Sequence, residues 1–205
     1  MKPTINIGLI NYEGGNCGSV IDSVHRLGYN IQSGSNARDY SSSDLLLIPG
    51  VGSYGSAIRS LIKSGMYDCI LQHVREGKPV LGICLGMQLL STDSLEGGYS
   101  RGLDLIPGQV AGFRGNHCHI GWNSLEMVSQ RDDLDYAKGK YVYFNHSFVY
   151  NTSLRYQVSQ SCFKGESFPA IILKDNIMGI QFHPEKSQSA GLSILSMSIE
   201  VLLNA

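Results

Sequence analysis

The sequence predicts a single α/β domain in which helices cover both faces of a parallel sheet, followed by an antiparallel part. In the first half, short apolar runs alternate with stretches of helical periodicity, as in parallel strands that are joined by helices. In the second half, strand-like runs are separated by turn-forming residues. No repeat, linker or low-complexity tract interrupts the chain, so we expect one domain over residues 1–205.

The order of the elements follows from hydrophobic periodicity. The run at 44–48, which is continuously apolar from Leu45 and which Pro49 and Gly50 stop, is typical of a strand buried on both faces. In the first half we expect strands at 4–10, 44–48 and 79–83 and helices at 16–27, 57–62, 66–74 and 85–90. In the second half we expect strands at 108–113, 124–128, 141–145, 156–163, 170–173 and 177–182, and a closing helix at 189–203.

Composition narrows the class of function. The chain has 16 basic and 17 acidic residues without any basic run, so it has no electrostatic reason to bind nucleic acid or an anionic membrane. The amino-terminal residues lack the pattern of a signal peptide, and no apolar run has the length of a membrane helix. The 5 cysteines are odd in number and form no CxxC pair. We therefore expect a cytoplasmic protein with reduced cysteines.

One cysteine carries the strongest chemical signal. Cys84 stands between Gly82 and Gly86, after a buried strand and before a helix, which is the pattern of a nucleophile elbow. The amino end of a helix favours the thiolate form, and the amide of Leu85 points to where an oxyanion forms. The alternative, a small buried cysteine without chemistry, describes the other four cysteines better.

The sequence also offers a base and a group that orients it. His183 and Glu185 follow the last predicted strand and are separated by Pro184, whose restricted φ fixes their relative placement. A cysteine nucleophile needs a base, and the base needs a group that orients it. His183 is predicted to exchange the proton of the thiol, and Glu185 to hold the ring.

Two further motifs are less specific. The turn at 49–53 is rich in glycine, which allows the backbone to approach a ligand closely; a phosphate cradle is an alternative, although no Walker motif follows. His117, Cys118 and His119 suggest a metal, but a complete ligand set is missing. We therefore predict neither a metal nor another cofactor.

These motifs, taken in order, resemble class I (triad-type) glutamine amidotransferases, and among them the glutaminase subunits of imidazole glycerol phosphate synthase. The resemblance runs nearly end to end, through Tyr12 with Gly15–Asn16, Pro49–Gly52, Gly82–Leu90, Gly121–Asn123, Tyr143–Ser147 and Gln181–Ser187. It implies a three-layer, flavodoxin-like α/β sandwich with a mixed sheet.

The resemblance also implies roles for the matching residues. Cys84 attacks the side-chain amide of glutamine, while His183 acts as acid and base and Glu185 orients it. The amides of Leu85, Val51 and Gly52 stabilise the oxyanion. The implied glutamine-binding residues are Gly52, Gln88, Ser147 and Phe148.

A partner subunit is part of the same resemblance. In this family a TIM-barrel cyclase subunit forms a heterodimer with the glutaminase and receives the ammonia through a tunnel. The residues that match the face towards the cyclase are Asn11, Tyr12, Asn16, Trp122, Tyr143 and Lys186. We also hypothesise that the Gly-Val-Gly segment at 50–52 is a gate, since glycine lets a peptide flip at low steric cost.

Four positions depart from the histidine-pathway pattern: Asn11, Glu13, Cys17 and Cys118 stand where aspartate, glycine, an aliphatic residue and proline are usual. None belongs to the predicted triad. A paralogous subunit that supplies ammonia for an amidino or amino sugar in surface polysaccharide synthesis is therefore an alternative. An autonomous cysteine peptidase or hydrolase, or a non-catalytic binding module, are alternatives of other classes.

Overall fold

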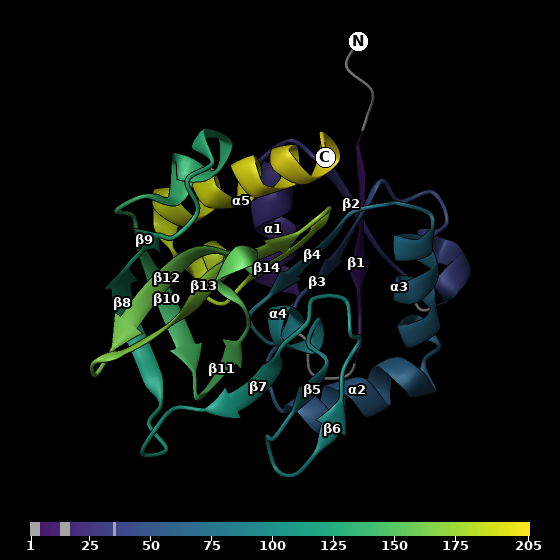
Figure 1. Ribbon diagram of the computed structural model, residues 1–205. Coiled ribbons are helices and arrows are strands. Elements are labelled where there is room, and N and C mark those ends of the chain that lie inside the picture. Colours follow the sequence, from purple (N-terminus) through teal and green to yellow (C-terminus); the bar gives the residue numbers. More distant parts are fainter. Residues whose placement is uncertain (1–4, 13–16, 35) are drawn as a thin grey trace.

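A central eight-stranded sheet lies between two layers of helices in the computed structural model, which describes residues 5–12, 17–34 and 36–205 (Figure 1). The parallel half of the sheet contains, in spatial order, β2 (Asn30–Gly34), β1 (Asn6–Ile10), β3 (Leu45–Ile48), β4 (Val80–Ile83) and β14 (Ile177–Ile180). The antiparallel half continues with β13 (Glu166–Lys174), β12 (Gln157–Phe163) and β9 (Glu126–Met127). The expected three-layer, flavodoxin-like fold with a mixed sheet is thus confirmed.

The helices divide between the two faces of the sheet. One face carries α1 (Gly18–Arg26) and α5 (Gln188–Leu203), and the other α2 (Tyr54–Lys63), α3 (Met66–Arg75) and α4 (Leu85–Leu89). Leu45 and Leu47 of β3 pack with the first group, whereas Leu46 and Ile48 pack with the second. Because successive side chains of a strand point to opposite faces, a strand between two helical layers must be apolar throughout.

Two smaller sheets flank the antiparallel half. One is a two-stranded ribbon of β8 (His119–Ser124) and β10 (Tyr141–His146). The other contains β11 (Phe148–Asn151), β7 (Gln109–Gly112), β5 (Asp93–Ser94) and β6 (Ser100–Arg101). Short 3-10 helices occur at η1 (Ala37–Tyr40), η2 (Asp132–Ala137), η3 (Leu154–Tyr156) and η4 (Pro184–Lys186).

Most expected elements are present, but the expected strand at 124–128 is wrong as a continuous unit. Ser124 ends β8, Leu125 turns into the core, and only Glu126–Met127 pair with β12. The pattern also does not predict β2. This edge strand is polar and only partly buried, so it lacks the apolar run that identifies the central strands.

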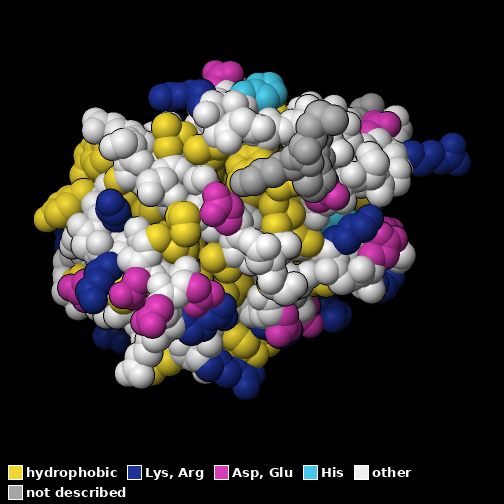
Figure 2. Space-filling model, turned by 90° about the horizontal axis from the view of Figure 1, so that it is seen from above, with side chains coloured by type: hydrophobic (Ala, Val, Ile, Leu, Met, Phe, Trp, Pro, Cys, Tyr) yellow, Lys and Arg dark blue, Asp and Glu magenta, His cyan; other side chains and the backbone are white. Residues whose placement is uncertain are grey.

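Charges of both signs are mixed on the surface. Figure 2 shows the molecule from above the view of Figure 1, with basic and acidic side chains next to one another and apolar atoms scattered between them. Such a face agrees with a formal net charge of −1. In the described part of the chain, every helix is too short or too polar to span a membrane.

Candidate active site

Cys84 occupies the sharp turn between β4 and α4. Its backbone has φ 55° and ψ −111°, a region that residues with a side chain rarely adopt. The amide of Cys84 donates to the carbonyl of Ile180 at 2.7 Å, which ties the turn to β14. A strained backbone that projects a nucleophile at the carboxyl end of a parallel strand is the predicted elbow.

The two glycines of the elbow are required by close packing. A Cβ atom at Gly86 would lie 1.8 Å from the carbonyl oxygen of Ile48, and one at Gly82 would lie 2.5 Å from the carbonyl oxygen of Gly86. Real Cβ atoms do not approach backbone atoms so closely. Helix α4 therefore packs directly on β3 and β4, and this contact places Cys84.

His183 and Glu185 form a buried pair on the loop after β14. Nδ1 of His183 lies 2.8 Å from Oε1 of Glu185, and both side chains are about one-twentieth exposed or less. The carboxylate holds the proton on Nδ1 and directs Nε2 towards other partners. Within the described residues, Nε2 of His183 makes no hydrogen bond of ordinary geometry, so it remains available to a thiol or a substrate.

The charge state of His183 results from opposing effects. Burial lowers the pKa of His183, but the nearby Cys84 and Glu185 outweigh burial and raise it to about 10. The ring is therefore an imidazolium at neutral pH, and it can donate a proton to a leaving amine. This arrangement suits a thiolate–imidazolium pair.

Ser187 holds the histidine loop against the ribbon, a role that the sequence pattern does not reveal. The Ser187 hydroxyl donates to the carbonyl of His183 at 2.6 Å and accepts the amide of Tyr143 at 2.9 Å. The amide of His183 in turn donates to the carbonyl of Tyr143 at 2.9 Å. The base is thereby attached to β10, a strand that also forms part of the outer surface.

A cavity of about 270 Å³ opens at Cys84. It is lined by every residue that was expected to form the oxyanion hole or bind glutamine: Val51, Gly52, Leu85, Gln88, Ser147 and Phe148. The cavity is large enough for a single amino acid. His183 does not line it, but Val51 also borders a small hollow that contains His183 and Glu185. Val51 therefore borders both the cavity at Cys84 and the hollow of the base.

Gln88 differs in part from its expected role. Its amide nitrogen donates to the carbonyl of Phe148 at 3.0 Å and to Oε1 of Gln181 at 3.1 Å. Both hydrogens are used within the protein, so only the side-chain oxygen remains to contact a ligand. Gln88 thus also holds the first residue of β11 in the wall of the cavity.

Glu96, Cys118 and Asn145, which the sequence did not place in the site, also line the cavity, and so does His146. Glu96 accepts the amide of Tyr54 at 3.0 Å, and burial raises the pKa of Glu96. It lies in a turn between two very short strands, where no periodic signal exists. Glu96 thus brings a carboxyl group to the cavity. The other polar side chains of the lining are neutral groups and cysteine thiols.

The His-Cys-His run at 117–119 does not converge. His117 lies 3.3 Å from Nζ of Lys164, Cys118 lines the cavity, and His119 is buried. Nδ1 of His119 lies 3.3 Å from Nε2 of His146, and burial lowers the pKa of both rings, for His146 to about 3. Among the residues that the structure describes, no three His, Cys, Asp or Glu side chains are placed to hold a metal ion.

The residues expected at a partner face do not all lie on the surface. Asn11, Trp122 and Lys186 are exposed and Tyr143 is half-buried, with the Trp122 and Tyr143 rings in edge contact at 6.1 Å. Tyr12 contradicts the expectation, because it is 4% exposed and its hydroxyl bonds inside the protein. Asn16 lies outside the described residues.

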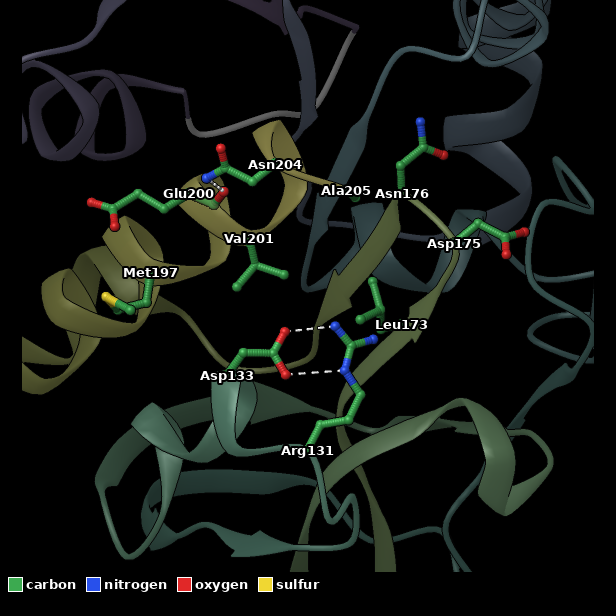
Figure 3. A pocket seen from close by; sticks show the side chains of 10 residues that line it. All are labelled: Arg131, Asp133, Leu173, Asp175, Asn176, Met197, Glu200, Val201, Asn204 and Ala205. Atoms are coloured by element: carbon green, nitrogen blue, oxygen red, sulfur yellow. Dashed lines mark hydrogen bonds and ion pairs between the residues drawn. The ribbon is translucent and has the colours of Figure 1, made fainter.

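A larger hollow lies elsewhere, and the described residues that line it include no cysteine, serine or threonine. It measures about 640 Å³ and lies between the end of α5, the β13–β14 turn and η2, where Arg131 and Asp133 form a two-fold ion pair (Figure 3). Asn176 of this hollow accepts the amide of Val80, at the amino end of β4, whereas Cys84 follows the carboxyl end. The two hollows are thus at opposite ends of the same strand.

The fold and the elbow site define the class of protein. The glutamine amidotransferase class-I family matches residues 9–200. The chain therefore belongs to the class I glutamine amidotransferases, and it is an enzyme of that class. Among solved structures, PurLQS from Thermotoga maritima matches with a TM-score of 0.76 over 98% of this chain and 100% of that chain, at 16% identity. That similarity concerns the fold.

More similar sequences indicate the particular branch. A Caldanaerobacter subterraneus protein named imidazole glycerol phosphate synthase subunit HisH is 45% identical over 92% of this chain and 95% of its own length. The HisH subunit of Methanothermobacter thermautotrophicus is 38% identical over 96% and 98%. The chloroplastic synthase hisHF of Arabidopsis thaliana is 36% identical over 92% of this chain but 33% of its own length.

Proposed function

We propose that the chain is the glutaminase subunit of imidazole glycerol phosphate synthase, which supplies ammonia for L-histidine biosynthesis. The observation that carries the proposal is the buried His183–Glu185 pair beside the elbow cysteine, at a cavity of the size of one amino acid. The names of the relatives at 36–45% identity support this branch over the surface-polysaccharide alternative. The five unpaired cysteines favour a cytoplasmic location.

The reaction follows from the chemistry of the site. The thiolate of Cys84 attacks the side-chain carbonyl carbon of glutamine, and the electron pair moves to the oxygen. The amides of Leu85 and the Val51–Gly52 segment stabilise this oxyanion. As it collapses, the C–N bond breaks and His183 donates its proton to the departing ammonia. Neutral His183 then takes a proton from water, which attacks the thioester and releases glutamate and Cys84.

The cavity can also select the amino-acid end of glutamine. The Glu96 carboxylate suits an α-ammonium group through a charge-assisted hydrogen bond. The backbone at Ser147 and Phe148, which Gln88 holds in place, lies on another wall of the cavity and suits the α-carboxylate. An α-amino group that is part of a peptide bond carries no charge, so Glu96 would have no ammonium group to pair with. This disfavours the peptidase alternative.

The ammonia requires a partner, because free ammonium at neutral pH does not act as a nucleophile. We propose that the partner is a TIM-barrel cyclase subunit in a heterodimer. Two thirds of the Arabidopsis synthase has no counterpart in this chain, which supports a second subunit. The outer face of the β8–β10 ribbon exposes Ile120, Trp122 and Tyr141, an apolar surface suited to such a subunit.

The test is glutamate release from glutamine by this chain mixed with the histidine-pathway cyclase, with and without the ribonucleotide ligand of the cyclase. We expect strong stimulation by the liganded cyclase and none for Cys84→Ala. If the cyclase gives no stimulation while a glutamine-analogue electrophile still labels Cys84, the surface-polysaccharide branch replaces the histidine branch. Hydrolysis of peptides by the chain alone would instead favour the peptidase.

A further inference from the structure

Tyr12 joins two segments that are 37 residues apart in the sequence. It follows β1, and its buried hydroxyl donates to the carbonyl of Pro49 at 2.7 Å. Pro49 directly follows β3 and begins the glycine-rich segment that leads to Val51 and Gly52. The carbonyl of Pro49 is therefore fixed by a side chain from the neighbouring strand of the sheet.

Gly50 leaves the space that this hydroxyl occupies. A Cβ atom at Gly50 would lie 2.1 Å from the hydroxyl oxygen of Tyr12, 2.9 Å from Cβ of Leu85 and 3.1 Å from the amide nitrogen of Gly86. Gly50 is thus confined between the Tyr12 hydroxyl and the first turn of α4. The separation between the oxyanion segment and Leu85 depends on this contact.

The Tyr12 hydroxyl is a permanent donor. Burial raises the pKa of Tyr12 well above its usual value, and Cys84 and Cys17 add to this effect. The group therefore keeps its proton throughout the working pH range of an enzyme. Pro49 is restricted at φ as well, so the segment is held up to Gly50.

The segment is less constrained beyond Gly50. Val51 and Gly52 are exposed, and Gly52 has φ +102°, which favours glycine. Their backbone amides make no hydrogen bond to any described residue. Because the segment is held as far as Gly50 and is less constrained after it, the amides of Val51 and Gly52 can reorient about Gly50.

We propose that Tyr12 is a positioning residue for the glutaminase reaction: its hydroxyl holds the Pro49 carbonyl and confines Gly50 against Leu85, which sets where the Val51 and Gly52 amides meet the oxyanion. The inference rests on the proposed function. It replaces partner contact as the role of Tyr12. The side chain acts through the backbone and does not touch glutamine.

The test is Tyr12→Phe, measured in the complex with the liganded cyclase. We expect kcat to fall about tenfold with little change in KM, because the misplaced amides serve mainly the transition state. The rate at which iodoacetamide alkylates Cys84 should stay the same, since alkylation forms no oxyanion. Tyr150→Phe is the matched control: this buried hydroxyl also donates to one backbone carbonyl, that of Ile106, and does not line the cavity.

Equal kcat values for Tyr12→Phe, Tyr150→Phe and the unchanged chain would overturn the inference, and so would a parallel loss of alkylation. Absence of glutaminase activity in the unchanged complex contradicts the proposed function instead. A second measurement uses Gly50→Ala, whose methyl group overlaps the hydroxyl. Gly50→Ala should lower Tm more in the chain that retains Tyr12 than in the chain that also carries Tyr12→Phe. Equal losses of Tm in the two chains would also overturn the inference.

Discussion

His183 is subject to three influences whose balance determines its protonation. Burial disfavours the imidazolium, whereas Cys84 and Glu185 favour it, and the resulting pKa is about 10. Because this value lies above that of an unfolded histidine, near 6.5, the charge contributes stability below that pH, and the contribution is lost as the pH rises through about 10. The proton needed for ammonia release is likewise present up to that pH.

Glu185→Gln should move the alkaline limb of activity to lower pH. The carboxylate is one of the groups that raise the pKa of His183, so its removal lets burial lower that pKa. We also expect kcat to fall by about 10²–10⁴-fold, because the ring loses its orienting partner. The measurement is kcat/KM for glutamine against pH in the liganded complex, with Glu200→Gln on α5 as control. An alkaline limb that does not move would contradict this account.

At the scale of elements, the site depends on how closely α4 approaches the sheet. The helix has only five residues, and its first turn lies against the carboxyl end of β3 without an intervening side chain. The elbow thus brings together the proposed nucleophile after β4, the proposed base on the loop after β14 and the proposed oxyanion segment at the end of β3. The carboxyl ends of adjacent parallel strands meet at one edge of the sheet, which makes this assembly possible.

Gly86→Ala should destabilise the protein by about 2–4 kcal/mol and abolish glutaminase activity. The added methyl group would lie 1.8 Å from the Ile48 carbonyl oxygen, so α4 or β3 must shift. The measurement is urea unfolding followed by circular dichroism. Gly18→Ala is the control, because no described residue lies within 4 Å of a Cβ atom there, and its effect should stay within about 0.5 kcal/mol. Similar losses for both variants would show that the close approach is unimportant.

At the scale of the whole molecule, the β8–β10 ribbon connects the catalytic centre to the outer surface. Its inner side contributes His119, Phe144 and His146 to the core, and its outer side exposes Ile120 and Trp122. Tyr143 pairs with Trp122, and the backbone of Tyr143 holds both His183 and Ser187. A subunit bound to the outer side would therefore contact β10, the strand whose backbone holds the loop of His183.

Trp122→Ala should weaken binding of the cyclase by about 10–100-fold, since a large aromatic side chain that is 47% exposed in the free subunit is a typical anchor of an interface. Alkylation of Cys84 in the free subunit should not change. Calorimetric titration with the cyclase gives the Kd. Leu154→Ala, at an exposed apolar residue on η3, serves as control. Equal affinity for both variants would place the interface elsewhere.

Local patterns in the sequence were sufficient for the central strands and the covering helices, and they singled out the three residues that we propose as the triad. A strand between two helical layers must be apolar throughout, and an elbow needs glycine on both sides of its nucleophile, so each feature is visible within about ten residues. The polar edge strand β2 and the break at Leu125 were not visible, because neither has a periodicity of its own.

The tertiary structure alone decided the contacts between distant segments. Tyr12 reaches Pro49, Glu96 accepts from Tyr54, and Ser187 bonds to the amide of Tyr143. These partners are 37, 42 and 44 residues apart. Such pairs depend on the order of strands in the sheet and on how loops meet at its edge, which no local periodicity encodes. The sequence therefore determined the reaction, and the packing of the sheet decided which residues support it.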